Sequence, residues 1–221
     1  MSVKAVIFDM DGLLLDTETL CLRVFEQACD KVGVPFLESL YLSIIGCNAK
    51  TIRTKLIEGY GKDLDYERLH QTWRQDYYRI ISTTPIDKKQ GVLPLLTWLK
   101  SQKIPTAVAT SSERSVAEQK LKLANLDQYF DHITTGCEVS CGKPDPEIYQ
   151  LAASRLNVPS KQCIALEDSN NGVKAALAAQ MLTYQIPDLV TPEEFKSSKY
   201  KIHANLNLVL SDFKKMHSVK K

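Results

Sequence analysis

The sequence lacks a marked excess of charge of either sign, a long apolar run and a leader-like N-terminus. Its 28 basic and 26 acidic residues give a formal charge of +2, whereas proteins that bind nucleic acid usually carry a clear basic excess. No window approaches the roughly 18 consecutive apolar residues of a membrane helix, and no signal peptide is visible. We therefore expect a cytoplasmic protein with no nucleic-acid partner and no membrane partner.

Closely spaced cysteines are also lacking, because none of the six forms a Cys-x-x-Cys pair. In a cytoplasmic protein, such cysteines are better explained as reduced thiols than as disulfides. Cys137 and Cys141 are four residues apart, but a zinc site would need a second Cys or His pair, and none stands out. The 221 residues, 44% of them hydrophobic, suffice for one or two domains with a substantial core.

The most informative stretch is a short apolar run that ends in two carboxylates. Residues 3–8 are almost entirely apolar, which predicts a buried parallel strand. Asp9 and Asp11 follow it, and Gly12 comes directly after them. Ligands of open α/β sheets bind outside the carboxyl ends of the strands, so both carboxylates would lie at the mouth of a site. A single Asp here could simply cap the next helix, but the whole string 9–18 is more specific than that.

The rest of the chain divides into an all-helical stretch and a stretch of alternating strands and helices. Residues 17–86 show apolar side chains at helical spacing and no strand, which predicts three or four helices. Further strands are expected at 104–109, 132–135, 163–166 and 181–186. We therefore predict an α/β fold, in which residues 1–16 and 87–221 form a doubly wound, Rossmann-like parallel sheet and residues 17–86 form a small all-helical domain.

Two segments near the C-terminus carry weaker patterns. Residues 188–201 are polar and contain Pro192, which is typical of a surface loop with a short helix. Residues 206–210 could add an edge strand to the sheet.

Polar residues also follow two of the later strands. Thr110 and Ser111 precede a helix, where a hydroxyl and backbone N–H groups can hold a phosphate oxygen, and Ser112 is the expected N-cap of that helix. Glu167 and Asp168 end the strand at 163–166 and could bind a metal. On local sequence alone, Asp168 or Ser169 could equally cap the following helix.

Most lysines are solvated surface residues, but the sequence around Lys143 is unusual for a lysine. The prolines that follow it should present it rigidly ahead of the next helix, in the string Gly142-Lys143-Pro144-Asp145-Pro146.

The order of these motifs resembles that of the haloacid dehalogenase-like superfamily of phosphohydrolases with a helical cap. All fixed positions of its first motif, Asp-x-Asp-Gly-x-x-x-Asp-[Ser/Thr], are present from Asp9 to Thr17. The resemblance implies that Asp9 is the nucleophile, that Asp11 is the acid and base, and that Lys143 neutralises the nucleophile and the phosphoryl oxygens. It also implies that Thr110 and Ser111 bind phosphate. Mg²⁺ would be held by Asp9, the backbone carbonyl of Asp11, Glu167 and Asp168.

Within this superfamily, the chain looks like sugar-phosphate and pseudouridine-5'-phosphate phosphatases and shares its motifs with β-phosphoglucomutase. We expect a Mg²⁺-dependent phosphatase that hydrolyses a small phosphate ester, such as a sugar phosphate or a nucleotide-like monophosphate, through an aspartyl-phosphate. We also expect it to be a monomer. Asn48, Lys50 and Arg53 are candidates for substrate specificity by position only.

Other members of the superfamily fit less well. Mutases carry a cap arginine shortly after the glycine that corresponds to Gly46, and the sequence lacks it at that offset, although Lys50 or Arg53 could substitute. Dehalogenases lack the second Asp of the first motif, and we can assign no Schiff-base lysine of the phosphonatase type. A catalytically silent binding module has no support, because every chemical position is filled.

Overall fold

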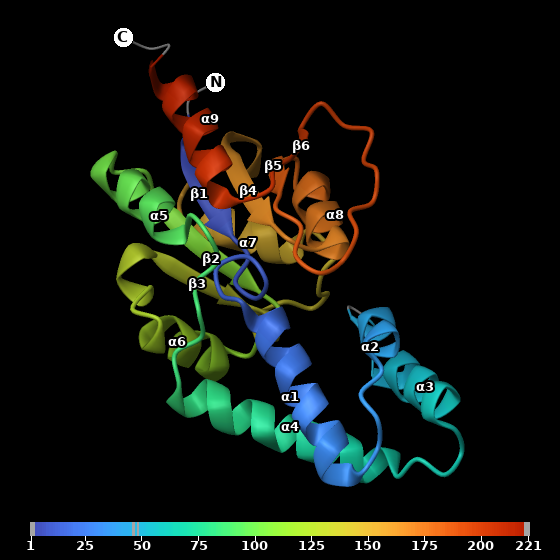
Figure 1. Cartoon of the computed structure of the whole chain (residues 1–221). Coiled ribbons are helices and arrows are strands. Elements are labelled where there is room, and N and C mark those ends of the chain that lie inside the picture. The colour runs from blue at the N-terminus through green and yellow to red at the C-terminus, as the bar shows by residue number, and fades with distance from the viewer. Residues whose placement is uncertain (1–2, 46, 48, 219–221) are drawn as a thin grey trace. The chain divides into compact units, whose positions relative to one another are not determined.

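The computed structural model describes residues 3–45, 47 and 49–218, and the chain divides into two compact units (Figure 1). The first unit comprises residues 1–16 and 85–221, and the second comprises residues 17–84. The second boundary falls two residues before the position expected from the sequence. Ile86, which is only 6% exposed, thus belongs to the first unit.

The first unit contains a parallel sheet of six strands among the described residues, in the order β3-β2-β1-β4-β5-β6 (Figure 1). From β1 to β6 these are Ala5–Phe8, Thr106–Thr110, His132–Thr135, Cys163–Glu167, Leu182–Gln185 and Tyr200–Ile202. The chain builds outward from β1 through β2 and β3, and then continues on the other side of β1 with β4. The topological switch point therefore lies between β1 and β4, and the predicted doubly wound α/β fold is confirmed.

Both faces of the sheet are covered, which explains why β1, β2 and β4 consist wholly of buried residues. On one face, the small residues of α7 (Glu147–Arg155) and α8 (Asn170–Ala178) pack against β1, β2 and β4. On the other face, Phe213 of α9 (Leu206–Ser218) contacts the rings of Tyr184 in β5 and Trp98 in α5 (Val92–Ser101). The helix α6 (Arg114–Leu123) connects β2 to β3.

The edge strand suggested for residues 206–210 is wrong, because this segment opens the helix α9. Leu206, Val209 and Phe213 follow the spacing of one helical face and are fully buried. Just before the helix, the side chain of Asn205 accepts hydrogen bonds from the backbone N–H groups of Asn207 and Leu208, as an N-cap residue does.

The short helix suggested within residues 188–201 is also wrong, because residues 188–199 run as a loop into β6. The side chain of Asn170 satisfies part of this backbone. It donates to the carbonyl of Thr191 at 3.2 Å and accepts from the N–H of Glu193 at 2.9 Å. These bonds replace the intrahelical pairing that a helix would supply.

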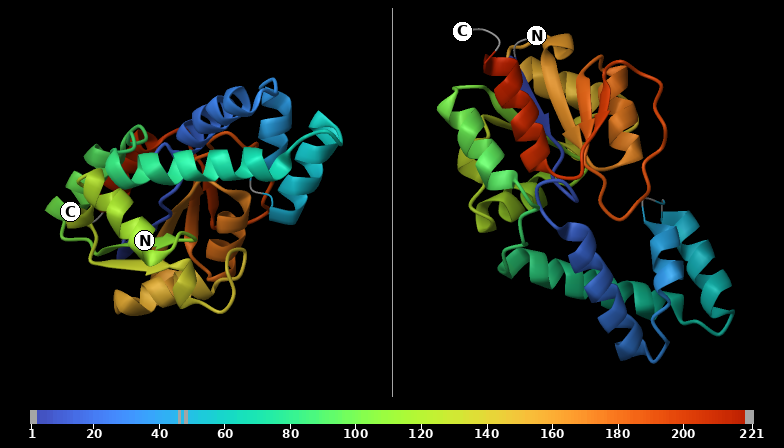
Figure 2. Two further views of the ribbon diagram at one scale, coloured as in Figure 1. Left: turned by 90° about the horizontal axis from the view of Figure 1, so that it is seen from below. Right: turned by 45° about the horizontal axis from the view of Figure 1, so that its top comes forward.

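The second unit is all helical and has a core of its own. Its helices are α1 (Thr17–Val32), α2 (Glu38–Ile44), α3 (Ala49–Tyr60) and α4 (Tyr66–Thr83), with α1 packed on α4 and α2 packed on α3 (Figure 2). At its centre, the ring of Phe25 lies 5.2 Å from that of Tyr41 and 4.9 Å from that of Trp73. Among the residues that the structure describes, no helix is both long and apolar enough to cross a membrane.

Gly91 offers a test of the packing between α5 and α9. It has φ = +92°, and a Cβ placed on it would lie 2.5 Å from the backbone nitrogen of Asn207. Gly91→Ala should therefore lower the free energy of unfolding by about 2–4 kcal/mol, since it combines left-handed strain with overpacking. Gly61→Ala is the control, because Gly61 has φ = +93° and nothing within 4 Å of the added Cβ.

The Gly61 variant should lose only about 1–2 kcal/mol, from backbone strain alone. Urea denaturation followed by circular dichroism measures both losses. Equal losses in the two variants would show that the approach of α9 to Gly91 does not constrain the fold.

Candidate active site

Three neighbouring strands end in polar residues at the same edge of the sheet. Asp9 follows β1, Thr110 ends β2 and Glu167 ends β4. Phe8 pairs with Leu166, and the backbone N–H of Asp9 donates to the carbonyl of Leu166 at 2.9 Å, so Asp9 and Glu167 leave the sheet side by side.

This register brings three carboxylates together. One oxygen from each of Asp9, Glu167 and Asp168 lies within 4.8 Å of the other two. The acids that the sequence placed on separate strands thus meet at the switch point, where open α/β sheets bind ligands.

The ammonium of Lys143 lies among these acids. It donates to Asp9 Oδ1 and to Glu167 Oε1, each at 2.5 Å, and to the backbone carbonyl of Ala109 at 3.0 Å. The side chain of Lys143 is only 7% exposed. It therefore joins the ends of β1, β2 and β4 through a single buried cation.

Burial dominates the electrostatics of the cluster. It raises the pKa of Asp9 to about 8, although the charge of Lys143 acts in the opposite direction. Burial and the neighbouring charge of Asp9 raise the pKa of Asp168 well above its usual range. For Lys143 the penalty of burial is outweighed by the charges of Asp9 and Glu167, so its pKa is raised. When all three carboxyl groups are ionised, their negative charge exceeds what one lysine can balance, and a bound cation would favour that ionised form.

Glu167 is held from both of its oxygens. Oε1 accepts from the Tyr149 hydroxyl at 2.7 Å, and Oε2 accepts from the hydroxyl and the backbone N–H of Ser169. Ser169 also accepts from the N–H of Gly172, so Ser169 rather than Asp168 caps α8. A Cβ on Gly172 would lie 1.8 Å from Glu167 Oε1, so this position requires glycine.

The side chain of Asp11 has a different setting from that of Asp9. Its two oxygens accept from Lys120 Nζ and Ser112 Oγ, both at 2.8 Å. Sequence reasoning missed Lys120, whose side chain is only 3% exposed. The helical spacing could have indicated its burial. Lys120 lies on the same face of the helix as the buried Ala117 and Leu121, where an apolar residue is expected.

The second predicted motif lies at the end of β2. Thr110 is buried, and its hydroxyl accepts from the backbone N–H of Ser112 at 3.1 Å, whereas Ser111 is exposed. The expectation that Ser112 caps α6 is wrong, because the N-cap residue is Glu113 and the Ser112 hydroxyl is directed to Asp11 instead. Phosphate binding by Thr110 and Ser111 stays a prediction.

The candidate specificity residues belong to the helical unit. Lys50 and Arg53 are both exposed on α3. The Arg53 guanidinium lies 5.2 Å from the centre of the Tyr66 ring, and its Nε lies 3.7 Å from Glu67. Asn48 lies outside the described residues.

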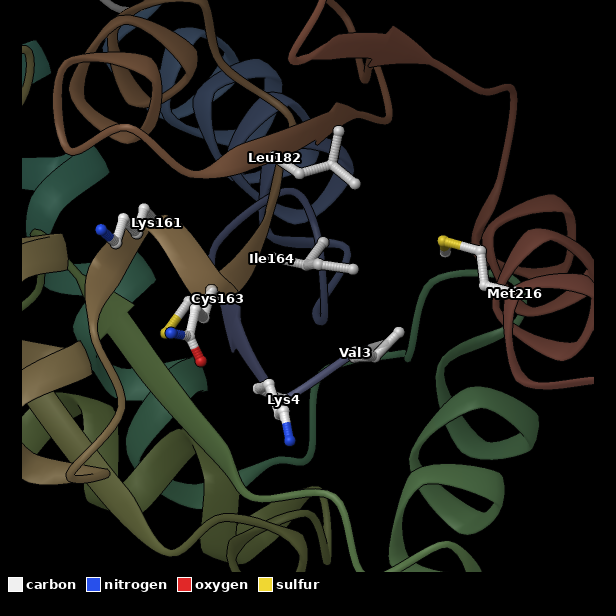
Figure 3. Close-up of a pocket in the computed structure, with 8 residues that line it drawn as sticks. Val3, Lys4, Lys161, Cys163, Ile164, Leu182 and Met216 are labelled. Carbon is white, nitrogen blue, oxygen red and sulfur yellow. The ribbon is translucent and has the colours of Figure 1, made fainter. Parts of the chain in front are cut away.

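A cavity of about 240 Å³ lies elsewhere in the first unit (Figure 3). Its lining includes the apolar residues Ile164, Leu182 and Met216 and the lysines Lys4 and Lys161. Ile164 and Leu182 lie at the amino ends of β4 and β5. The cavity is therefore at the edge of the sheet opposite to the carboxylate cluster.

Comparison with known proteins adds independent findings. A family model described as haloacid dehalogenase-like hydrolase matches residues 3–180. A phosphorylated carbohydrates phosphatase of Thermotoga maritima is 36% identical over 177 residues, which cover 80% of this chain and 82% of that protein. A probable pseudouridine-5'-phosphatase of Drosophila melanogaster is 32% identical and covers 96% and 92% of the two chains. A β-phosphoglucomutase of Bacillus subtilis is 31% identical, with 81% of each chain covered.

The buried position of Lys143 can be tested through stability. Lys143→Met leaves Asp9 and Glu167 without their cation, so in EDTA at pH 9 the free energy of unfolding should fall by roughly 3–5 kcal/mol. The loss should be smaller at pH 6, because Asp9, with its pKa raised to about 8, then takes up a proton and the repulsion decreases.

Lys174→Met is the matched control, since Lys174 forms an exposed ion pair with Glu193. Its loss should stay within about 1 kcal/mol at either pH. Urea denaturation at the two pH values compares both variants. A Lys143 variant that behaves like the Lys174 variant would contradict the electrostatic role of Lys143.

Proposed function

The chain belongs to the haloacid dehalogenase-like hydrolase family, and we propose that it is a Mg²⁺-dependent phosphatase that acts through an aspartyl-phosphate on a small phosphorylated metabolite. The substrate class is a sugar phosphate or a nucleotide-like monophosphate. The observation that carries the proposal is the position of Lys143 between Asp9 and Glu167, within a cluster of three carboxylates. Two relatives named as phosphatases of phosphorylated carbohydrates and of pseudouridine 5'-phosphate support the substrate class.

The donor set of the cluster fits Mg²⁺. This ion prefers oxygen ligands and binds through a few carboxylates while it keeps several waters. The carboxylates of Asp9, Glu167 and Asp168 and the backbone carbonyl of Asp11 would hold the ion. When bound, it would balance the negative charge that a phosphate dianion brings next to the carboxylate of Asp9.

The chain's own residues then divide the work of two steps. In the first step, a carboxylate oxygen of Asp9 attacks phosphorus, and Asp11 gives a proton to the leaving alcohol oxygen. In the second step, Asp11 takes a proton from a water that attacks the aspartyl-phosphate, which releases phosphate and restores Asp9. Lys120 and Ser112 keep the Asp11 carboxylate in a defined orientation through their hydrogen bonds.

The oxygens of the transferred group also need donors. We assign this role to the Lys143 ammonium, the Thr110 hydroxyl and the segment around Ser111 that precedes α6. Backbone N–H groups at the start of a helix are suited to phosphate oxygens. Lys143, which already contacts Asp9, lowers the repulsion between the nucleophile and the phosphoryl group.

Substrate selection is assigned to the helical unit, in which Asn48, Lys50 and Arg53 are the proposed residues. The catalytic residues, in contrast, all lie in the first unit. This division would let one set of catalytic side chains serve different phosphate esters.

A phosphosugar mutase of the β-phosphoglucomutase type is the second candidate, and the similarity to the Bacillus subtilis mutase favours it. A mutase must hold a second phosphate, and Lys50 and Arg53 are the exposed cations of α3 that could do so. Hydrolysis remains the preferred function because the sequence lacks an arginine at the offset that mutases use.

Asp9→Asn tests the nucleophile. The variant should fold, because the amide has the size and shape of the carboxyl group, but turnover should fall to the limit of detection. Asp127→Asn, at an exposed aspartate, serves as the control and should keep full activity. Both are measured as phosphate release from p-nitrophenyl phosphate with Mg²⁺. More than a few per cent of residual activity in the Asp9 variant would rule out Asp9 as the nucleophile.

Metal dependence and reaction type are tested together on the unmodified protein. Phosphate release from a panel of sugar phosphates and nucleoside monophosphates should require Mg²⁺ and stop in EDTA, because Asp9 and phosphate repel each other without the cation. In parallel, β-glucose 1-phosphate is followed for isomerisation. Isomerisation that strongly outpaces release would identify a mutase. Failure to process any monophosphate with Mg²⁺ would remove the enzymatic proposal altogether.

A further inference from the structure

One buried acid, Asp188, has no part in the reaction described above. It follows β5 in the loop that leads to β6, and its side chain is only 8% exposed. Oδ1 accepts from Lys89 Nζ at 2.6 Å, and Lys89 also contacts Asp16 at 3.3 Å. Oδ2 is buried and has no hydrogen-bond partner within the part of the chain that the structure describes. The ion pair with Lys89 therefore accounts for only one of the two carboxylate oxygens.

The second oxygen of Asp188 lies beside the carboxylate cluster. Gly12 has φ = +85°, and a Cβ placed on it would lie 2.4 Å from Asp168 Oδ2 and 3.4 Å from Asp188 Oδ2. Both oxygens lie within 3.4 Å of one point, so they are at most about 6 Å apart. Because Gly12 has no side chain, a space is left beside two acids, Asp168 after β4 and Asp188 after β5.

We propose that Asp188 is an outer carboxylate of the cation site, and that its Oδ2 accepts a hydrogen bond from the hydration shell of the Mg²⁺ ion. This inference rests on the metal site of the proposed function and adds a residue to it. Neighbouring ligands of an octahedral Mg²⁺ ion are about 3 Å apart, and a hydrogen bond adds about 2.8 Å. A water beside Asp168 in such a shell can therefore reach Asp188, which does not need to touch the ion.

The electrostatic setting favours this role over that of a direct ligand. Lys89 compensates Asp188 at Oδ1, so Asp188 adds an acceptor next to the ion without adding a fully unbalanced charge. Residues that bond to the ligands or waters of a metal orient them, and their loss typically weakens metal affinity by 10–100-fold. Gly12 contributes by leaving room for that water, since any side chain at this position would meet Asp168.

Mg²⁺ affinity, measured without substrate, tests the inference. MgCl₂ is titrated calorimetrically into the full chain after removal of divalent ions, for the unmodified protein, Asp188→Leu, Lys89→Met and the double variant. We expect Asp188→Leu, which has no acceptor, to weaken binding by about tenfold. Lys89→Met should not weaken it, because that variant keeps the acceptor. The double variant should bind as weakly as Asp188→Leu.

The double variant separates the acceptor from simple charge. Asp188→Leu leaves the Lys89 ammonium less balanced, and this alone could repel Mg²⁺. If the double variant recovered the affinity of the unmodified protein, charge balance would explain the effect and the inference would be overturned. Unchanged affinity in Asp188→Leu would overturn it directly. Should Asp188→Leu fail to fold by circular dichroism, the charge-balanced double variant decides the matter through the same two results.

Failure of the inference is distinguishable from failure of the proposed function. If the unmodified protein binds Mg²⁺ and the Asp188 variants bind it equally well, only the role of Asp188 is wrong. If the unmodified protein takes up no Mg²⁺, the metal site itself is wrong and the role of Asp188 falls with it.

Discussion

The buried contact of one ammonium with two carboxylates is the interaction on which the site depends. Ionised groups taken out of water are costly unless they are paired and hydrogen-bonded. Lys143 meets this requirement for Asp9 and Glu167, and it reaches them from the segment between β3 and α7. The segment must therefore be held firmly, since a displaced Lys143 would leave both acids uncompensated.

Glu138 provides this support at the base of the segment. Its carboxylate accepts from Arg155 at 2.8 Å, from the backbone N–H of Thr135 at 2.9 Å and from Arg114. These donors, with the Arg155 bond as the largest cause, lower the pKa of Glu138. The start of the segment that carries Lys143 is thus anchored to β3, α6 and α7 through Glu138.

The sequence was sufficient to predict the fold class and the edge of the sheet at which its polar motifs gather. Apolar runs that end in Asp9, Thr110 and Glu167 predict parallel strands, and parallel strands bring their carboxyl ends together. The partners of these residues were harder to foresee. Tyr149 and Lys120 lie on helices whose packing angle decides what they contact, and no local pattern encodes that angle.

The C-terminal segments show a second limit. A five-residue window at 206–210 cannot separate a strand from a helix, and the decisive burial of Phe213 lies beyond it. The sequence predicts only that Asp188 lies in a polar loop, because a sequence does not reveal that a loop residue is buried. Its contact with Lys89 spans 99 positions, which no analysis of neighbouring residues can anticipate.

The junction between the two units has a consequence for how the chain can change. The backbone N–H of Asp16 donates to the carbonyl of Asp87 at 2.8 Å, and Leu15 pairs with Lys88. The chain therefore leaves the sheet-bearing unit and re-enters it at adjacent points. The entropic cost of closing a loop rises only slowly with its length. The segment inserted between these points can therefore be lengthened, shortened or replaced by another domain while the paired residues at the junction stay the same.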